Sequence, residues 1–316
     1  MTAQPPTRPP KGPSKRPQTR HRTRSSTGPS VARGFVEVAD RVFVARYPAW
    51  DVNVGLVLGR DGAVVIDTRS SDAQGRHALD DVRRLGRDIT VTHVVNTHVH
   101  FDHTFGNAAF DTATVHAHDN VGRTIAADAE RVKALFRADP GAAPELGYTA
   151  QDAADVLATV VRAPDRTFGS NATIDLGDRV VTMTYAGRGH TDGDIAVVVP
   201  DTDAVFLGDL IEESAHPSFG GDCWPFDWPD TLTSHLYQTS DRTVVIPGHG
   251  RPVDTAFAEA QRDDIAAVAS VIRARRLGGH TLEDALREPD DRLPYPLEWL
   301  GSAIRRGWEQ ANPPVA

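Results

Sequence analysis

The run from Thr97 to His103, THVHFDH, constrains this chain more than any other feature. It follows an apolar, strand-like segment over residues 90–96 and gathers three histidines and one carboxylate within six positions. Imidazole nitrogens and carboxylate oxygens together suit a borderline divalent ion such as zinc. If the run stays extended, His98 and His100 lie on one side of the backbone, whereas the adjacent Asp102 and His103 point apart and can serve a second ion. The spacing therefore predicts a two-metal site on a loop after a strand.

The first 33 residues differ in composition from the rest of the chain. They hold eight Lys and Arg residues, no Asp or Glu, and many Pro, Ser and Thr residues, so they cannot bury a core. We therefore expect residues 1–33 to form a disordered basic tail ahead of one domain over residues 34–316. That domain carries the other 26 of 34 basic residues against all 43 acidic ones, a net charge of −17. So acidic a body repels phosphate, and we expect no nucleic-acid partner.

Apolar runs and cysteine content narrow the cellular context. No uninterrupted apolar run reaches the roughly 20 residues of a membrane span, and the N-terminal residues contain no apolar segment typical of a secretory signal. We therefore expect a cytoplasmic protein without a membrane partner, and the sequence carries no signal of an oligomeric state. The single cysteine, Cys223, excludes an internal disulfide framework and a zinc site made of four cysteines.

Short apolar runs, helical spacing and turn signals divide the domain into two successive sets of strands and helices. Strands are expected over 35–38, 42–45, 53–58, 63–67, 90–96, 114–118, 172–176, 179–185, 195–199, 204–207 and 244–246. Helices are expected over 71–85, in an Ala-rich insertion over about 120–163 that breaks at Pro140-Gly141, over 230–237, and within about 255–310 as 255–275, 282–287 and 297–309. Hairpins and covering helices in both sets predict an α+β fold with two sheets packed face to face and helices outside.

Three further ligand candidates lie downstream, each at the end of a strand-like run and each beside glycine. The motifs are Gly-His-Thr at His190, Gly-Asp at Asp209 and Gly-His-Gly at His249. Side chains at strand ends on a sheet edge are held firmly by the scaffold. The flanking glycines let the backbone pass close to an ion. We therefore expect these three residues to join the cluster at 98–103.

Taken together, five motifs resemble those of the metallo-β-lactamase superfamily. The resemblance covers roughly Gly34 to His249, most of the predicted domain. The motifs are Asp67-Thr68, the HxHxDH run at 98–103, Gly189-His190-Thr191, Gly208-Asp209 and Gly248-His249-Gly250. The resemblance implies an αββα sandwich of two mixed sheets, with two metal ions at one edge. It also implies a bridging Asp209, a first ion bound by His98, His100 and His190, and a second bound by Asp102, His103 and His249.

Two positions narrow the subclass that this resemblance implies. β-Lactamases with a cysteine ligand carry it where this chain has Asp209, and Cys223 lies 14 residues further on. β-Lactamases whose ligands are histidines keep the HxHxDH run but generally lack the bridging aspartate. The ligand set is therefore most similar to the hydroxyacylglutathione hydrolase (glyoxalase II) and lactonase branch, while antibiotic hydrolysis stays open.

Other residues are candidates for supporting roles. Asp67 ends an apolar strand, where a buried carboxylate needs a partner such as the free ring nitrogen of a ligand histidine. Asp194 is a second candidate for such a role. The aromatic stretch after Asp209 is either a packed loop or a pocket wall, and its candidate pocket residues are His216, Trp224, Phe226 and Trp228. The other histidines are expected outside the site, with His93, His116 and His118 in packing and His21, His77, His235 and His280 on the surface.

The ligand set also predicts a chemistry. Two ions that share a water molecule lower its pKa toward neutrality and provide hydroxide at physiological pH. We therefore expect a dinuclear hydrolase in which a metal-bridging hydroxide attacks a carbonyl, with Asp102 and Asp209 as the carboxylates of the catalytic centre. The expected cofactors are two divalent ions, zinc first, with iron or manganese as alternatives. The expected substrate is a small molecule: a thioester, lactone, ester or β-lactam.

Other functions stay open on the same residues. An iron-dependent oxidoreductase of this fold, similar to persulfide dioxygenases, requires an empty second site, which the presence of His103, Asp209 and His249 disfavours. Flavodiiron proteins carry glutamate where His100 stands and add a flavin domain, and this chain has neither. A phosphodiesterase or nuclease is disfavoured by the acidic body. A non-catalytic binding module has no evident use for seven ligands.

Overall fold

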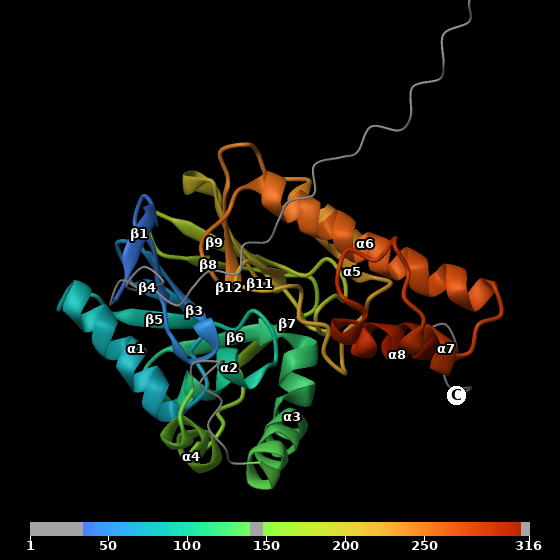
Figure 1. Ribbon diagram of the computed structural model, residues 1–316. Coiled ribbons are helices and arrows are strands. Elements are labelled where there is room, and N and C mark those ends of the chain that lie inside the picture. Colours follow the sequence, from blue (N-terminus) through green and yellow to red (C-terminus); the bar gives the residue numbers. More distant parts are fainter. Residues whose placement is uncertain (1–33, 140–147, 311–316) are drawn as a thin grey trace, which may run out of the picture. The chain divides into compact units, whose positions relative to one another are not determined.

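The computed structural model describes residues 34–139 and 148–310, whose strands form two mixed sheets (Figure 1). The strands of the first sheet follow chain order: β1 (Val36–Ala39), β2 (Val42–Arg46), β3 (Asn53–Leu58), β4 (Ala63–Ile66), β5 (Val91–Val95), β6 (Thr114–His118) and β7 (Arg166–Phe168). Pairing is antiparallel from β1 to β4 and parallel from β4 to β7. The predicted tail over 1–33 and the predicted break at Pro140-Gly141 lie outside the described residues.

The second sheet packs against the first across a shared apolar core. Its order is β12 (Val244–His249), β11 (Ala204–Glu212), β10 (Ala196–Val199), β9 (Val180–Thr184) and β8 (Asn171–Asp175). Only β11 and β12 are parallel to each other. Alternate residues of facing strands fill the interior, for example Val57 and Met183, which are fully buried. Gly55 allows the close approach, because a Cβ there would lie 2.4 Å from Cε1 of Phe206.

Helices cover the outer faces of both sheets, and the layers are therefore α, β, β and α. Helix α1 begins after Ser71, whose Oγ accepts from the backbone N–H of Gln74, and it buries Ala78 and Val82 against the first sheet. Helices α5, α6 and α8 cover the second sheet. The helices are α1 (Asp72–Leu85), α2 (Phe101–Thr104), α3 (Asp119–Ala138), α4 (Ala150–Ala158), α5 (Trp228–Leu236), α6 (Thr255–Leu277), α7 (Leu282–Arg287) and α8 (Gly301–Gln310).

Short 3-10 turns complete the described elements: η1 (Ala49–Asp51), η2 (Phe105–Ala109), η4 (Pro200–Thr202) and η5 (Leu297–Trp299). None of the described helices is both long and apolar enough to span a membrane. The predicted α+β fold with two packed sheets and outer helices is confirmed.

Several element boundaries differ from the predictions. The strand expected over 204–207 continues to Glu212, because β11 goes on pairing with β12 after a register shift at Gly208, whose φ is 51°. Asp209 therefore lies inside a strand and not at its end. The three-residue β7 was not predicted, since its pairing with β6 leaves no local pattern. The last helix begins at Gly301, after the separate turn η5.

Candidate metal centre

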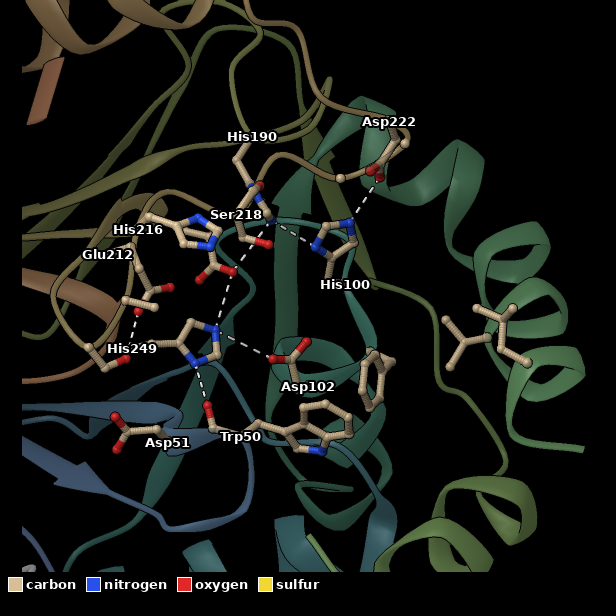
Figure 2. A pocket seen from close by; sticks show the side chains of 18 of the residues that line it. Trp50, Asp51, His100, Asp102, His190, Glu212, His216, Ser218, Asp222 and His249 are labelled. Atoms are coloured by element: carbon tan, nitrogen blue, oxygen red, sulfur yellow. Dashed lines mark hydrogen bonds and ion pairs between the residues drawn. The ribbon is translucent and has the colours of Figure 1, made fainter. Parts of the chain in front are cut away.

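Seven predicted ligands from both sheets converge at one edge of the sandwich. His98 and His100 lie in the loop after β5, and Asp102 and His103 form the first turn of α2. His190 follows β9, Asp209 lies within β11, and His249 ends β12. Figure 2 shows the side chains of His100, Asp102, His190 and His249 pointing toward one another. Strands of both sheets and the segments that follow them thus hold the cluster.

The side chains fall into two groups of potential ligands. In each group, one donor atom per residue lies within 4.8 Å of all the others. The first group is His98, His100, His190 and Asp209, and the second is Asp102, His103 and His249. Within the second group, Oδ2 of Asp102 lies 3.6 Å from Nε2 of His103. The expectation that these two adjacent side chains point apart is wrong, because the run turns into helix α2 and does not stay extended.

Asp209 lies between the two groups. Its Oδ2 is 3.4 Å from Nε2 of His190, a member of the first group, and 3.2 Å from Nε2 of His249, a member of the second. Its Oδ1 lies 3.2 Å from Nε2 of His103. One carboxylate therefore lies within 3.4 Å of imidazole nitrogens of both groups.

The donor set fits two divalent ions. Among the residues that the structure describes, the buried Nε2 of His98 has no hydrogen-bond partner, a state that costs free energy unless a ligand binds there. Nε2 of His190 and Nδ1 of His100 face each other at 2.8 Å. Nitrogen and carboxylate oxygen donors suit zinc, iron or manganese.

The charges of the cluster are strongly coupled. Burial lowers the pKa of His98 well below its usual value, with a further contribution from His103. Burial also lowers the pKa of His190, to about 4. For His249, burial opposes the charged form, but the charge and hydrogen bond of Asp209 outweigh it and raise the pKa to about 10. Buried carboxylates here therefore require positive charge beside them.

The carboxylate of Asp67 orients His103 directly and His98 through Thr97, on the side of each ring that faces away from the centre. Asp67 is 3% exposed, and its Oδ2 accepts from Nδ1 of His103 at 2.8 Å. The same carboxylate accepts from the backbone N–H and the hydroxyl of Thr97, both at 2.8 Å. The Thr97 hydroxyl in turn accepts from Nδ1 of His98 at 3.0 Å. We call Asp67, Thr97, His98 and His103 the Asp67 network, and it leaves Nε2 of both histidines facing the centre.

The loop between β11 and α5, residues 213–227, orients two other histidines. Nε2 of His100 donates to Oδ2 of Asp222 at 2.9 Å, and Nδ1 of His190 donates to the carbonyl of Ser218 at 2.9 Å. We call this segment the β11–α5 loop. Figure 2 shows Asp222 and Ser218 beside the two imidazoles. The carbonyl of Trp50 plays the same part for His249, accepting from its Nδ1 at 2.7 Å.

Asp194 holds the turn that carries His190. Its buried carboxylate accepts from the backbone N–H and the hydroxyl of Thr191, both at 2.8 Å. Burial raises the pKa of Asp194 to about 7. Its contact is with the turn and not with a ligand ring, so its role differs from that of Asp67.

A cavity of about 850 Å³ opens over the centre. One wall is apolar and comes from η1, α2 and α3, with Trp50, Phe101 and Phe136 in edge-to-face contact. The opposite side is polar and is formed by β11 and the β11–α5 loop, with Glu212, His216, Ser218 and Asp222. The predicted insertion thus contributes helix α3 to the pocket.

With this geometry in place, comparisons with known proteins are informative. The family described as "Metallo-beta-lactamase superfamily" matches residues 47–281 of the chain. The protein belongs to the metallo-beta-lactamase superfamily. The resemblance stated from the motifs is thereby confirmed at the level of the superfamily.

Two curated members of the superfamily are similar in sequence. The acyl-coenzyme A thioesterase MBLAC2 of Homo sapiens is 27% identical over 220 residues, covering 62% of this chain and 72% of the relative. Metallo-beta-lactamase type 2 of Bacillus cereus is 24% identical over 203 residues, covering 63% and 68%. Both relatives are hydrolases by name.

A solved structure shares the fold. The sec-alkylsulfatase Pisa1 from Pseudomonas sp. superposes with a TM-score of 0.69 at 18% identity, covering 88% of this chain. The chain spans half the length of that alkylsulfatase. At this identity the likeness concerns the αββα fold alone.

The aromatic pocket prediction needs correction within this superfamily fold. His216 lines the cavity, but Trp224, Phe226 and Trp228 do not belong to its lining. Trp228 is fully buried and donates from Nε1 to the carbonyl of Leu210. Trp224 lies under two guanidinium groups, and Phe226 packs under a third. The ring of Trp228 instead packs against the ring of His190, with centroids 5.7 Å apart, so Trp228 supports a predicted ligand without lining the cavity. The apolar wall of the cavity comes from the first half of the chain.

Two other side chains lie in the apolar interior. Cys223 is fully buried, burial raises the pKa of its thiol, and neither ligand group includes it. His235 was expected on the surface, but it is 9% exposed on helix α5. Burial lowers the pKa of His235 to about 4. The surface prediction for His235 is wrong, because His235 lies on the buried side of α5 together with Leu232 and Leu236.

Sequence reasoning missed several residues that contact the ligands. They are Trp50, Thr97, Ser218 and Asp222, together with the pocket residue Glu212. Ser218 and Trp50 act through backbone carbonyls, which no residue type reveals. Asp222 follows two glycines in an irregular loop and has no strand-end signal. Thr97 was visible as the residue before the His cluster, and its hydroxyl is the signal that could have identified it.

Proposed function

We propose that this protein is a dinuclear metal-dependent hydrolase that cleaves an activated carbonyl compound. The observation that carries the proposal is the pair of ligand groups that share Asp209. A mononuclear enzyme has no need for the second group of Asp102, His103 and His249. We infer that zinc occupies both positions, since the set has three imidazoles at one position and two imidazoles with a carboxylate at the other.

Each residue has a distinct part in this proposal. Two divalent ions bound here would supply hydroxide at neutral pH and polarise the substrate carbonyl. Asp209 would bridge the two positions, and Asp102 would complete the second. Asp67 and Asp222 would keep the ring nitrogens of His103 and His100 in the ligating tautomer.

The pocket supports a small substrate with an apolar acyl group or ring. We place that group against Trp50, Phe101 and Phe136, opposite the polar side of the cavity. Among the described lining residues, Arg131 is the one basic side chain besides histidine, and it pairs with Asp128. The pocket therefore offers little to a polyanion, so a coenzyme A thioester would keep its phosphates outside. Esters, lactones and β-lactams fit the lining as well as thioesters do.

Metal content and substrate assays on one preparation test the proposal. Protein purified without added metal is examined by elemental analysis and assayed against a thioester, a lactone and a chromogenic cephalosporin. We expect two equivalents of metal and turnover of one of these substrates, with turnover lost after chelation and restored by zinc. One equivalent of iron without hydrolysis of any carbonyl would overturn the proposal in favour of an oxygen-using enzyme of the same fold.

A pocket variant tests where the acyl group lies. Phe136→Ala removes part of the apolar wall far from the ligands and should raise KM for a long-chain substrate on the order of tenfold. A short-chain analogue of the same substrate serves as the control, and its KM should stay unchanged. Equal effects on both substrates would place the acyl group elsewhere.

A further inference from the structure

The β11–α5 loop orients two ligand histidines without regular structure of its own. It spans residues 213–227 between β11 and α5, and it holds His100 through Asp222 and His190 through Ser218. The side chain of Asp222 is 43% exposed. A carboxylate in such a loop stays aligned with a buried imidazole only if other parts of the protein hold the loop.

Polar contacts to the loop come from the C-terminal segment of the chain. Nε of Arg306, on α8, donates to the carbonyl of Cys223 at 3.0 Å. Its guanidinium lies over the ring of Trp224, 4.9 Å from the centroid. The backbone N–H of Phe226 donates to Gln310 at 3.2 Å. Arg306 therefore fixes the peptide between Cys223 and Trp224, one residue beyond Asp222.

Apolar contacts join the same two segments. Leu300, Ala303 and Ile304 of the C-terminal segment belong to the buried cluster that contains Cys223 and Trp228. At the other end of the loop, the ring of Trp299 stacks on His216, with centroids 4.3 Å apart and planes 20° apart. Helix α8 thus contacts residues 223–226 of the loop, and Trp299, just before α8, contacts its other end. Both Trp299 and α8 lie beyond the residues 47–281 that match the superfamily.

We propose that helix α8 positions the first ligand group through the contact of Arg306 with the β11–α5 loop. Arg306 is a positioning residue: it keeps Asp222 against Nε2 of His100 and so keeps Nδ1 of that ring facing His190 and the centre. The inference rests on the proposed metal centre. It predicts that one metal-binding step depends on a helix outside the superfamily match, whereas the other step does not.

Metal affinity measured on the full-length protein tests this dependence. Apoprotein is titrated with Zn²⁺ against a chromogenic chelator, which gives a dissociation constant for each step. Asp222→Ala identifies the step that belongs to the His100 group. Arg306→Ala should weaken that same step about three- to tenfold, less than the 10–100-fold typical of a direct partner. Arg305→Ala, on the exposed side of the same helix, is the matched control and should change neither step.

Non-additivity separates positioning from general stability. If Arg306 acts through Asp222, the double variant should bind Zn²⁺ about as weakly as Asp222→Ala alone. Arg306→Lys keeps the charge and one donor and should give an intermediate constant, and it also replaces Arg306→Ala if the latter does not fold. Unchanged constants, or equal weakening of both steps, would overturn the inference. A wild-type protein that binds fewer than two ions would instead refute the proposed function.

Discussion

The candidate centre is supported by two regions of very different character. The Asp67 network lies at the end of β4, where one carboxylate with 3% exposure accepts three hydrogen bonds. The β11–α5 loop, an irregular segment, supports His100 through Asp222. The side chain of Asp222 is 43% exposed and accepts a hydrogen bond from Nε2 of His100. The first region begins directly after strands β4 and β5 of the first sheet. The second is contacted by helix α8.

We infer from this difference that Asp67 contributes both to the stability of the fold and to ligand orientation. Asp222 contributes to ligand orientation alone. Asp67 adopts a left-handed backbone conformation, with φ of 61°, that few residues other than glycine, asparagine and aspartate accept. Its side chain also closes the loop that carries the His cluster. A change at Asp67 therefore alters stability and site together, whereas a change at Asp222 alters the site alone.

The largest effect should come from Asp209, which contacts histidines oriented by both regions. Asp209→Ala removes the carboxylate that contacts both ligand groups, so we expect turnover to fall at least about 10³-fold and second-site occupancy to drop. Steady-state kinetics and elemental analysis measure these two quantities. Cys223→Ser is the control and should keep both metal equivalents. Loss of one equivalent in Cys223→Ser would mean that the thiol is a ligand after all.

A change in the Asp67 network should affect stability and metal binding at once. Asp67→Asn keeps a residue that tolerates positive φ, but its amide nitrogen would face the donors of Thr97 or His103. We expect the apoprotein to lose about 2–4 kcal/mol of unfolding free energy and zinc affinity to fall about 10–100-fold. Chemical denaturation of the apoprotein and a zinc titration measure the two effects. A loss of zinc affinity without a loss of stability would show that the Asp67 network, like the β11–α5 loop, affects the site alone.

A change in the loop should affect metal binding without affecting stability. Asp222→Ala removes the acceptor of His100 at a half-exposed position, so we expect one zinc step to weaken about 10–100-fold. The melting temperature of the apoprotein should stay within error of the wild type. Asp222→Asn keeps an acceptor oxygen and should recover much of the affinity. If the melting temperature of Asp222→Ala is as low as that of Asp67→Asn, both regions contribute to stability and the proposed difference between them is wrong.

The smallest effect concerns the stability at low pH of the helical layer that contains α5. His235 is buried on α5, and burial lowers its pKa to about 4. The unfolded chain binds a proton near pH 6.5 and the folded protein does not, so stability is full above pH 6.5 and falls as pH drops toward 4. Between pH 7 and pH 5, the unfolding free energy of His235→Leu should therefore fall by about 1–2 kcal/mol less than that of the wild type. Chemical denaturation at both pH values measures this difference. An equal fall in both proteins would contradict the lowered pKa of His235.

Much of the fold was visible in the sequence because its signals are local. The helix over 72–85 has an apolar stripe and a serine cap, and both lie within one segment. Strands β3 and β4 are two short apolar runs on either side of a Gly-Arg-Asp-Gly turn. Strand β7 and the extension of β11 were missed, because each depends on pairing with a strand far away in sequence.

The same distinction applies to the candidate centre. The HxHxDH run and the glycine-flanked His190, Asp209 and His249 were recognisable because a ligand set is a property of residue type and spacing. The aromatic stretch was recognised as well, but Trp224, Phe226 and Trp228 lie outside the lining of the pocket. Residue type told which rings are apolar, and only the packing of the loop decided where they point.

The sequence by itself determined the superfamily, the two-sheet architecture and the set of potential ligands. These depend on short-range periodicity and on the chemistry of individual side chains. Only the tertiary structure decided how the ligands are oriented, since Asp67, Trp50, Ser218 and Asp222 reach the histidines across large sequence separations. Two of those contacts use backbone carbonyls, which every residue carries. Their specificity comes from the packing of the sheets and of helix α8, which no local pattern encodes.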